Sequence, residues 1–87
     1  RDIAFMIDKK YTNAQIEQHI QKTAGDIFEQ VTLFDVYEGQ NIPEGKVSLA
    51  YYIRYRAKDR TLKDEEVNSM HDKIAKSLAE KFQIEFR

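Results

Sequence analysis

Residues 28–56 read FEQVTLFDVYEGQNIPEGKVSLAYYIRYR, in which two runs of β-branched and aromatic residues surround a loop with two glycines and one proline. β-Branched and aromatic residues favour strands, whereas glycine and proline favour turns. We therefore predict two antiparallel strands, residues 28–37 and 46–56, joined by a loop over 38–45.

The second of these strands alternates cleanly between two kinds of side chain. Successive side chains of a strand point to opposite faces of the sheet. The predicted inward face is apolar and aromatic, with Leu49, Tyr51, Ile53 and Tyr55. The predicted outward face is small at one end and basic at the other, with Ser48, Ala50, Tyr52, Arg54 and Arg56.

The first strand changes phase in its middle, between Leu33 and Phe34. Apolar residues occupy odd positions before this point and even positions after it. Either both faces of the strand are covered, or a β-bulge resets the alternation. We favour the bulge, which turns Phe34 and Val36 inward and leaves Asp35 and Tyr37 outward.

The flanking sequence supplies four further elements. Thr12 and Gln15 stand at capping-box spacing before a helix that Gly25 ends, and Thr61 and Asp64 repeat this spacing before a longer apolar periodicity. Alternation of apolar residues predicts a strand at each end of the chain. The predicted elements are a strand over 1–8, a helix over 12–24, a helix from 61 to 82 and a strand over 83–87.

The predicted order is β-α-β-β-α-β, which is typical of the ferredoxin-like α+β fold. In that topology a four-stranded antiparallel sheet has two helices on one face and leaves its other face open. The first and third strands are central, and the second is an edge strand beside the third. We expect one domain over residues 1–87, with Asp35 and Tyr37 beside Ser48 and Ala50 on the open face.

The composition argues against several classes of function. The 87 residues include no cysteine, so thiolate metal sites and disulfides are excluded, and no apolar run is long enough to cross a bilayer. His19 and His71 lack partners at metal-site or triad spacing and are interpreted as surface or boundary residues. We expect a soluble cytoplasmic chain with no catalytic residue, metal or cofactor of its own.

The open face has the chemistry of a base-binding surface. The carboxylate of Asp35 accepts hydrogen bonds, and the Watson–Crick edge of guanine presents N–H donors. Tyr37 or Tyr52 offers a ring for stacking, Ser48 offers a hydroxyl, and Ala50 lets a flat ring approach the backbone.

The charge distribution is compatible with this reading although the net charge is −1. The segment from Lys46 to Arg60 holds five basic residues and one acidic residue, and Arg54, Arg56 and Lys58 are candidates for phosphate contacts. A plainer interpretation also fits, because an edge-strand acid guards against strand pairing, and alternating Tyr and Arg is ordinary surface composition. From the pattern alone, both interpretations stay open.

The chain also resembles a known family. The likeness covers nearly the whole chain and lies in five segments in order: RDIAF (1–5), LFDVYEG (33–39), GKVSLA (45–50), RTLKDEEV (60–67) and the terminal Phe86-Arg87. These segments resemble the ferredoxin-fold anticodon-binding domain that closes the β subunit of bacterial-type phenylalanyl-tRNA synthetases. Val47 departs from the family, which often has a lysine there.

The resemblance implies a non-catalytic, C-terminal piece of a larger subunit that binds the anticodon stem-loop of tRNA(Phe). Aminoacylation would occur elsewhere in an α/β heterotetramer, whose α subunit uses ATP and magnesium. The family's contacts to the first anticodon base, a guanine, correspond here to Asp35, Tyr37 and Ser48, with Ala50 beside them. Ferredoxin-like domains also serve as small-ligand regulatory or protein-docking modules, which are the alternative functions.

Overall fold

The computed structural model describes residues 1–86 and has the β-α-β-β-α-β order expected from the sequence. The four strands form one antiparallel sheet in the order β2-β3-β1-β4, so β1 and β3 are central and β2 is an edge, as predicted. The elements are β1 (Asp2–Asp8), α1 (Asn13–Ala24), the short 3-10 helix η1 (Gly25–Ile27), β2 (Phe28–Tyr37), β3 (Lys46–Tyr55), α2 (Asp64–Phe82) and β4 (Glu85–Phe86).

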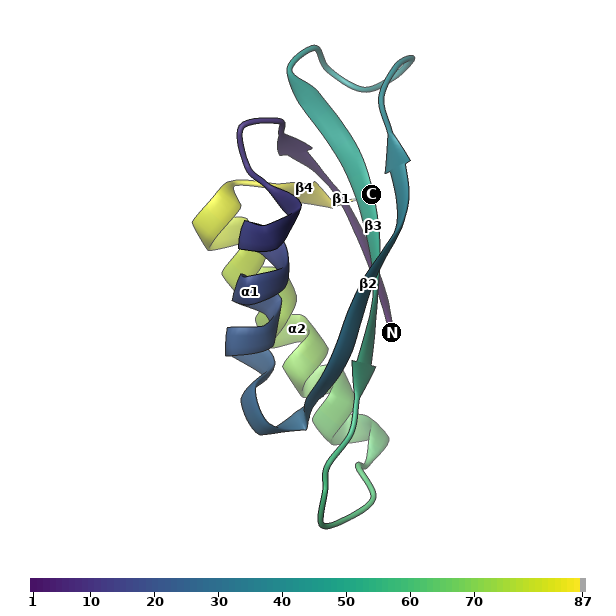
Figure 1. The fold of residues 1–87 in the computed structure, drawn as a ribbon, viewed down its shortest axis with the longest axis vertical. Helices are drawn as coiled ribbons and strands as arrows, with labels where there is room; N and C mark the ends of the chain where they lie inside the picture. Colours follow the sequence, from purple (N-terminus) through teal and green to yellow (C-terminus); the bar gives the residue numbers. More distant parts are fainter. Residues whose placement is uncertain (87) are drawn as a thin grey trace.

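Both α-helices lie on the same side of the sheet (Figure 1). The core fills the space between them and the sheet, where the rings of Phe5 and Tyr51 stack with centroids 5.9 Å apart. The Tyr51 hydroxyl donates to Oδ1 of Asn13 at 2.6 Å and so joins β3 to the start of α1. Burial raises the pKa of Tyr51 well above its usual value.

The two helix starts differ in how well the sequence predicted them. At α1 the prediction is confirmed: Thr12 is the N-cap, and Thr12 and Gln15 exchange the two hydrogen bonds of a capping box. At α2 the prediction is wrong, because the cap position is Lys63 and not Thr61. The carboxylate of Glu66 accepts from the Lys63 backbone N–H at 3.3 Å, and the Glu66 backbone N–H donates to the Lys63 carbonyl at 3.0 Å. The helix therefore starts without a hydrogen bond to a threonine hydroxyl.

The ends of two predicted strands also shift. Gln83 takes a left-handed conformation with φ of 54° and ends α2, so β4 begins only at Glu85, later than expected. Arg87, the predicted last residue of that strand, lies outside the described residues. Strand β3 ends at Tyr55, and Arg56 instead donates its backbone N–H to the Ile27 carbonyl at 2.8 Å.

The predicted bulge in β2 is confirmed, because the pairing with β3 shifts register between Leu33 and Asp35. Val36 then pairs with Leu49 on the helix side of the sheet. However, Phe34 and Val36 remain 56% and 57% exposed, so the bulge does not bury them as inward residues. The physical reason is visible in Figure 1, where the β2–β3 hairpin extends past the ends of the helices.

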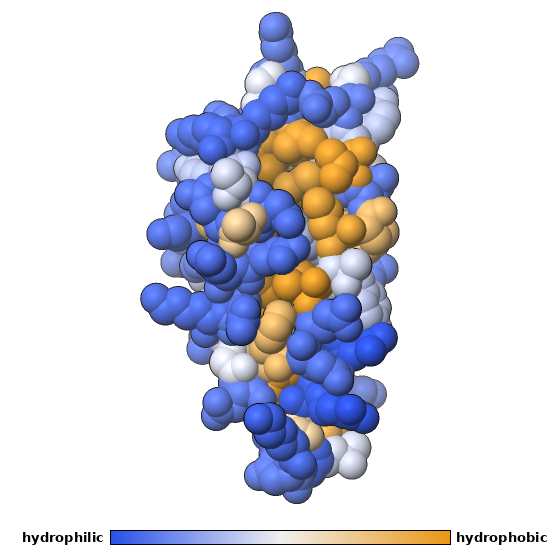
Figure 2. Space-filling model, viewed as in Figure 1, coloured by the Kyte–Doolittle hydropathy of each residue, from blue (hydrophilic) through white to orange (hydrophobic). Residues whose placement is uncertain are grey.

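Figure 2 shows apolar side chains gathered beside α1 over the upper part of the sheet, while most of the visible surface is hydrophilic. Within residues 1–86, neither helix is both long and apolar enough to cross a membrane.

Candidate nucleic-acid interface

The open face of the sheet brings together the residues that the sequence placed there. Asp35 pairs with Ala50 and Tyr37 pairs with Ser48 across β2 and β3. Directly paired residues of antiparallel strands lie on the same face with their Cβ atoms about 5 Å apart. The predicted neighbourhood of an acid, an aromatic ring and two small residues is therefore present.

Strand β1 extends this surface with two residues that were not among the predicted site residues. Ala4 pairs with Ala50, and Met6 pairs with Ser48. Two rows of paired residues therefore cross the face from β2 through β3 to β1: Asp35–Ala50–Ala4 and Tyr37–Ser48–Met6. The position of Ala4 and Met6 beside Ala50 and Ser48 depends on the β1–β3 register, which the sequence does not reveal.

Asp35 has the properties of an available hydrogen-bond acceptor. Its side chain is exposed. The ion pairs within residues 1–86 use other carboxylates, those of Glu29, Glu38 and Glu66. An exposed carboxylate beside the small Ala50 side chain can accept N–H groups from a flat ligand without first breaking an ion pair.

The two tyrosines of the open face offer their rings. Tyr37 is 43% exposed and Tyr52 is 41% exposed. The Tyr37 hydroxyl already donates to the Gln40 carbonyl at 3.2 Å, so its ring face is the part that remains for a ligand. Tyr52 pairs with Thr32 on one side and Asp2 on the other, one row away from the Asp35–Ala50 pair.

Ser48 is placed differently from what a direct base contact needs. It is fully buried, and Ala50 is only 6% exposed. Both residues form the floor of the face, below the more exposed Tyr37 and Asp35. A hydrogen bond from the Ser48 hydroxyl to a base would therefore require the surrounding side chains to move apart.

The two arginines are not equivalent. Arg54 pairs with Gln30 and is exposed on the open face, as expected. Arg56 lies beyond the end of β3, and its guanidinium contacts the Glu29 carboxylate at 3.4 Å. The sequence predicted both on the outward row of β3, but the structure keeps only Arg54 within that strand.

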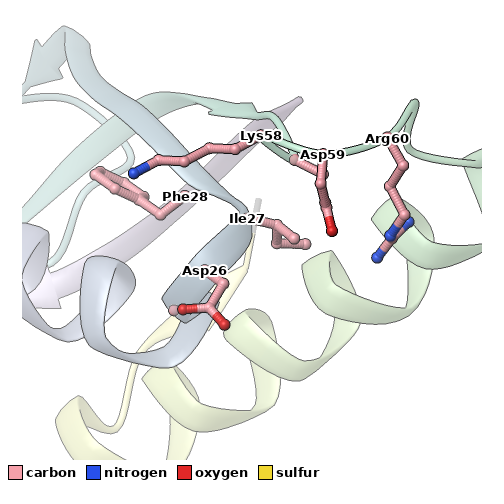
Figure 3. A pocket seen from close by; sticks show the side chains of 8 residues that line it. Asp26, Ile27, Phe28, Lys58, Asp59 and Arg60 are labelled. Atoms are coloured by element: carbon pink, nitrogen blue, oxygen red, sulfur yellow. The ribbon is translucent and has the colours of Figure 1, made fainter.

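A polar hollow of about 480 Å³ lies apart from this face, between η1 and the β3–α2 connection (Figure 3). The hollow has no excess of either charge, because two acidic and two basic side chains line it. One of the basic groups, Arg60, contacts Glu66 at 2.6 Å. The lining residues are Gly25, Asp26, Ile27, Phe28, Ala57, Lys58, Asp59 and Arg60.

The histidines are half-buried, which agrees with the prediction that they are surface or boundary residues. His71 accepts from the Tyr55 hydroxyl through Nδ1 at 3.1 Å and donates from Nε2 to the Asp2 carbonyl at 3.0 Å, as a neutral imidazole does. His19 bonds Ser77 through Nε2 at 2.6 Å. Burial lowers the pKa of both imidazoles. Among residues 1–86, no group of three or more His, Asp or Glu side chains is arranged to hold a metal ion.

A family model and individual relatives both relate the chain to the same kind of protein. The family described as "Ferredoxin-fold anticodon binding domain" matches residues 1–87. The chain is 48% identical to the phenylalanine–tRNA ligase β subunit of Syntrophotalea carbinolica, 42% to that of Synechococcus elongatus and 41% to that of Bacillus subtilis, each over 87 residues. Each alignment covers 100% of this chain but only 11% of the relative, so the chain spans a small part of their length.

Proposed function

Because the chain belongs to the ferredoxin-fold anticodon-binding domain family, we propose that it is the tRNA-reading domain of a phenylalanine–tRNA ligase β subunit. In this proposal residues 1–87 form one domain at the C-terminal end of the subunit. The domain binds the anticodon stem-loop of tRNA(Phe) in the cytoplasm, whereas aminoacylation with ATP and magnesium takes place elsewhere in an assembly with the α subunit. The observation that carries the proposal is the exposed Asp35 carboxylate beside the small floor of the open sheet.

The geometry supports a specific way of reading the base. A guanine ring laid over Ala50 directs its N1–H and N2–H groups at the Asp35 carboxylate, which accepts both. Adenine presents an acceptor at N1 and has no N2 amino group, so it leaves the carboxylate unsatisfied. A good bidentate contact of this kind discriminates by about 1–3 kcal/mol.

The remaining residues of the open face have supporting roles in the proposal. Tyr37 and Tyr52 stack on bases through their exposed rings, which contributes about 1–3 kcal/mol for each stacked base. Ser48 joins the base contact once the side chains above it separate. Arg54 lies further along the same face and takes a phosphate, while Arg56 must first leave Glu29.

The experiment compares binding of the 87-residue chain to two fluorescent anticodon stem-loops, with guanine or adenine at the first anticodon position, at about 50 mM salt. We expect tighter binding to guanine, and we expect Asp35→Ala to remove the preference. Asp72→Asn is the matched control, because it removes an exposed carboxylate from α2 on the opposite side of the sheet.

If the free chain does not bind, the same substitutions are made in the intact ligase, and kcat/KM for charging tRNA(Phe) is measured. We expect a loss of about fivefold to 150-fold for Asp35→Ala and none for Asp72→Asn. An unchanged kcat/KM in Asp35→Ala would show that this carboxylate does not read the anticodon.

A further inference from the structure

The loop that joins β2 to β3 has a defined conformation. The Ile42 N–H donates to the Gly39 carbonyl at 3.1 Å, which closes a four-residue turn. Asn41, the third residue of this turn, has φ of 73°, whereas Gln40 before it has no positive φ. A positive φ at the third residue alone is the signature of a type II turn.

This turn determines where the Gln40 carbonyl points. The central peptide of a type II turn, here between Gln40 and Asn41, is flipped relative to the commoner type I turn. Its carbonyl is the group that accepts from the Tyr37 hydroxyl at 3.2 Å. The conformation of Asn41 and the position of the Tyr37 side chain are therefore linked through one hydrogen bond.

Gly39 lies directly against the same side chain. A Cβ at position 39 would lie 3.6 Å from the Tyr37 hydroxyl oxygen and 3.8 Å from Cζ. The φ of Gly39 is 132°, which residues with a Cβ rarely adopt. A side chain at position 39 would thus strain the backbone that carries the turn, although the space beside the ring would admit it.

The loop is in turn fastened to the rest of the domain. Glu38 forms an ion pair with Lys9, and the Lys9 backbone N–H donates to the Gly45 carbonyl at 3.0 Å. Lys9 follows β1 directly, so the base of the loop is held to a central strand. The residues on both sides of the turn are therefore held to the end of β1 by these two contacts.

We propose that the turn Gly39–Ile42 is a positioning device that holds the Tyr37 ring in place for stacking, with Gly39 and Asn41 as positioning residues. The inference rests on the proposed function, because it assigns the turn a role in RNA binding by the open face. The physical reason is preorganisation: a side chain already fixed before binding loses less rotamer entropy when a base stacks on it. If the Tyr37 side chain were no longer fixed before binding, we expect the affinity for RNA to fall about twofold to tenfold.

The test uses substitutions that change the turn, together with one that removes the Tyr37 hydroxyl and keeps its ring. Asn41→Gly keeps the positive φ, whereas Asn41→Val opposes it because β-branched residues avoid that region. Tyr37→Phe removes only the hydroxyl that the turn holds. Gly45→Ala is the control for loop strain, since Gly45 also has a positive φ of 85° but no atom lies within 4 Å of a Cβ there.

The first measurement needs no RNA: NMR side-chain couplings of the free 87-residue chain report the rotamer of Tyr37. We expect one rotamer in the unmodified chain, in Asn41→Gly and in Gly45→Ala, and rotamer averaging in Asn41→Val and Tyr37→Phe. A fixed Tyr37 ring in Asn41→Val would overturn the inference, whatever the domain binds.

The second measurement is affinity for the guanine-containing stem-loop, or kcat/KM for charging in the intact ligase. We expect Asn41→Val and Tyr37→Phe each to weaken binding about twofold to tenfold, and the double variant to be no weaker than either single one. Additive losses in the double variant would overturn the inference.

Tyr37→Ala separates this inference from the proposed function. If Tyr37→Ala weakens binding but Asn41→Val and Tyr37→Phe do not, the ring stacks without help from the turn, and only the inference fails. If Tyr37→Ala has no effect on binding, the stacking role of Tyr37 in the proposed function fails as well.

Discussion

The two faces of the sheet are built from the same strands but have opposite properties. Adjacent residues of β3 show this most directly, because Tyr51 is fully buried against Phe5 whereas Tyr52 is exposed on the other side. The helix-covered face holds the apolar core, and the open face holds the exposed Asp35 and two half-exposed tyrosine rings. Strand alternation thus places the groups that stabilise the domain and the groups proposed to bind RNA one residue apart.

This separation predicts that substitutions on the two faces have separable effects. Changes on the helix-covered face lower the free energy of unfolding. Changes on the open face alter RNA affinity and leave that free energy nearly unchanged, because exposed side chains away from caps and cores contribute little to it.

The largest effect is expected for Phe5→Ala. Phe5 is fully buried and stacks on Tyr51, so its removal leaves a cavity and costs about 3–5 kcal/mol of unfolding free energy. Urea denaturation measures this loss. Phe86→Ala is the matched control, since Phe86 pairs with Phe5 in the sheet but is 48% exposed. A similar loss in both variants would contradict the division between covered and uncovered parts of the sheet.

On the open face, Tyr52→Ala is expected to weaken stem-loop binding by about 1–3 kcal/mol through lost stacking. Its free energy of unfolding should stay within about 0.5 kcal/mol of the unmodified chain. Tyr11→Ala is the contrasting variant, because the Tyr11 ring packs edge-on against Phe82 at 4.9 Å on the helix side. It should lower stability and leave the affinity of the folded domain unchanged. The reverse pattern would move the binding surface away from the open face.

The sequence predicted the regular parts of this fold well because they follow from short-range patterns. Alternation in β3, capping at Thr12 and the phase change after Leu33 each depend on residues close together in the chain. The start of α2 was misplaced because the helix begins after Lys63, where the Glu66 N–H donates to the Lys63 carbonyl and the Glu66 carboxylate accepts from the Lys63 N–H, without the threonine cap expected at Thr61. Spacing alone does not show that this helix starts at a lysine, whose side chain cannot accept a capping hydrogen bond.

For the candidate site, the sequence predicted which β2 and β3 residues share the open face but not how deep each one lies. Ser48 and Ala50 were expected as accessible small residues, yet both are buried in the floor of the face, where each is flanked by one cross-strand neighbour from β2 and one from β1. The role of Gly39 was also missed. Its contact with Tyr37 depends on the path of the loop, which glycine and proline content alone does not specify.

A smaller, pH-dependent effect is expected from His71. Burial is the main cause that lowers the pKa of its imidazole in the folded chain, and the N-terminal amine and the Arg1 side chain lower it further. The hydrogen bond to the Asp2 carbonyl and the charge of Asp72 oppose this shift without reversing it. The unfolded state therefore binds more protons, and stability falls as the pH drops below about 6.5. His19 has a pKa lowered in the same direction and adds to this slope.

Unfolding free energies measured by urea denaturation between about pH 7.5 and 5.5 test this expectation. His71→Gln should flatten part of the slope and leave the share of His19. A slope that is unchanged in His71→Gln would show that the imidazole gains its proton equally easily in the folded and unfolded states.

The smallest effect is expected for Val36→Thr, at the end of the sheet that the helices do not reach. Val36 pairs with the buried Leu49 on the helix side, but it is mostly exposed, so a hydroxyl there remains hydrated. Threonine keeps the β-branched shape, and the free energy of unfolding should change by less than about 0.5 kcal/mol. Ile53→Thr, on the same face below the helices, buries a hydroxyl and should cost several times more. A loss above about 1 kcal/mol in Val36→Thr that grows with protein concentration would mean that another copy of the chain covers this end in solution. In that case the helices would cover one part of this face and a second copy of the chain would cover the end that the helices do not reach.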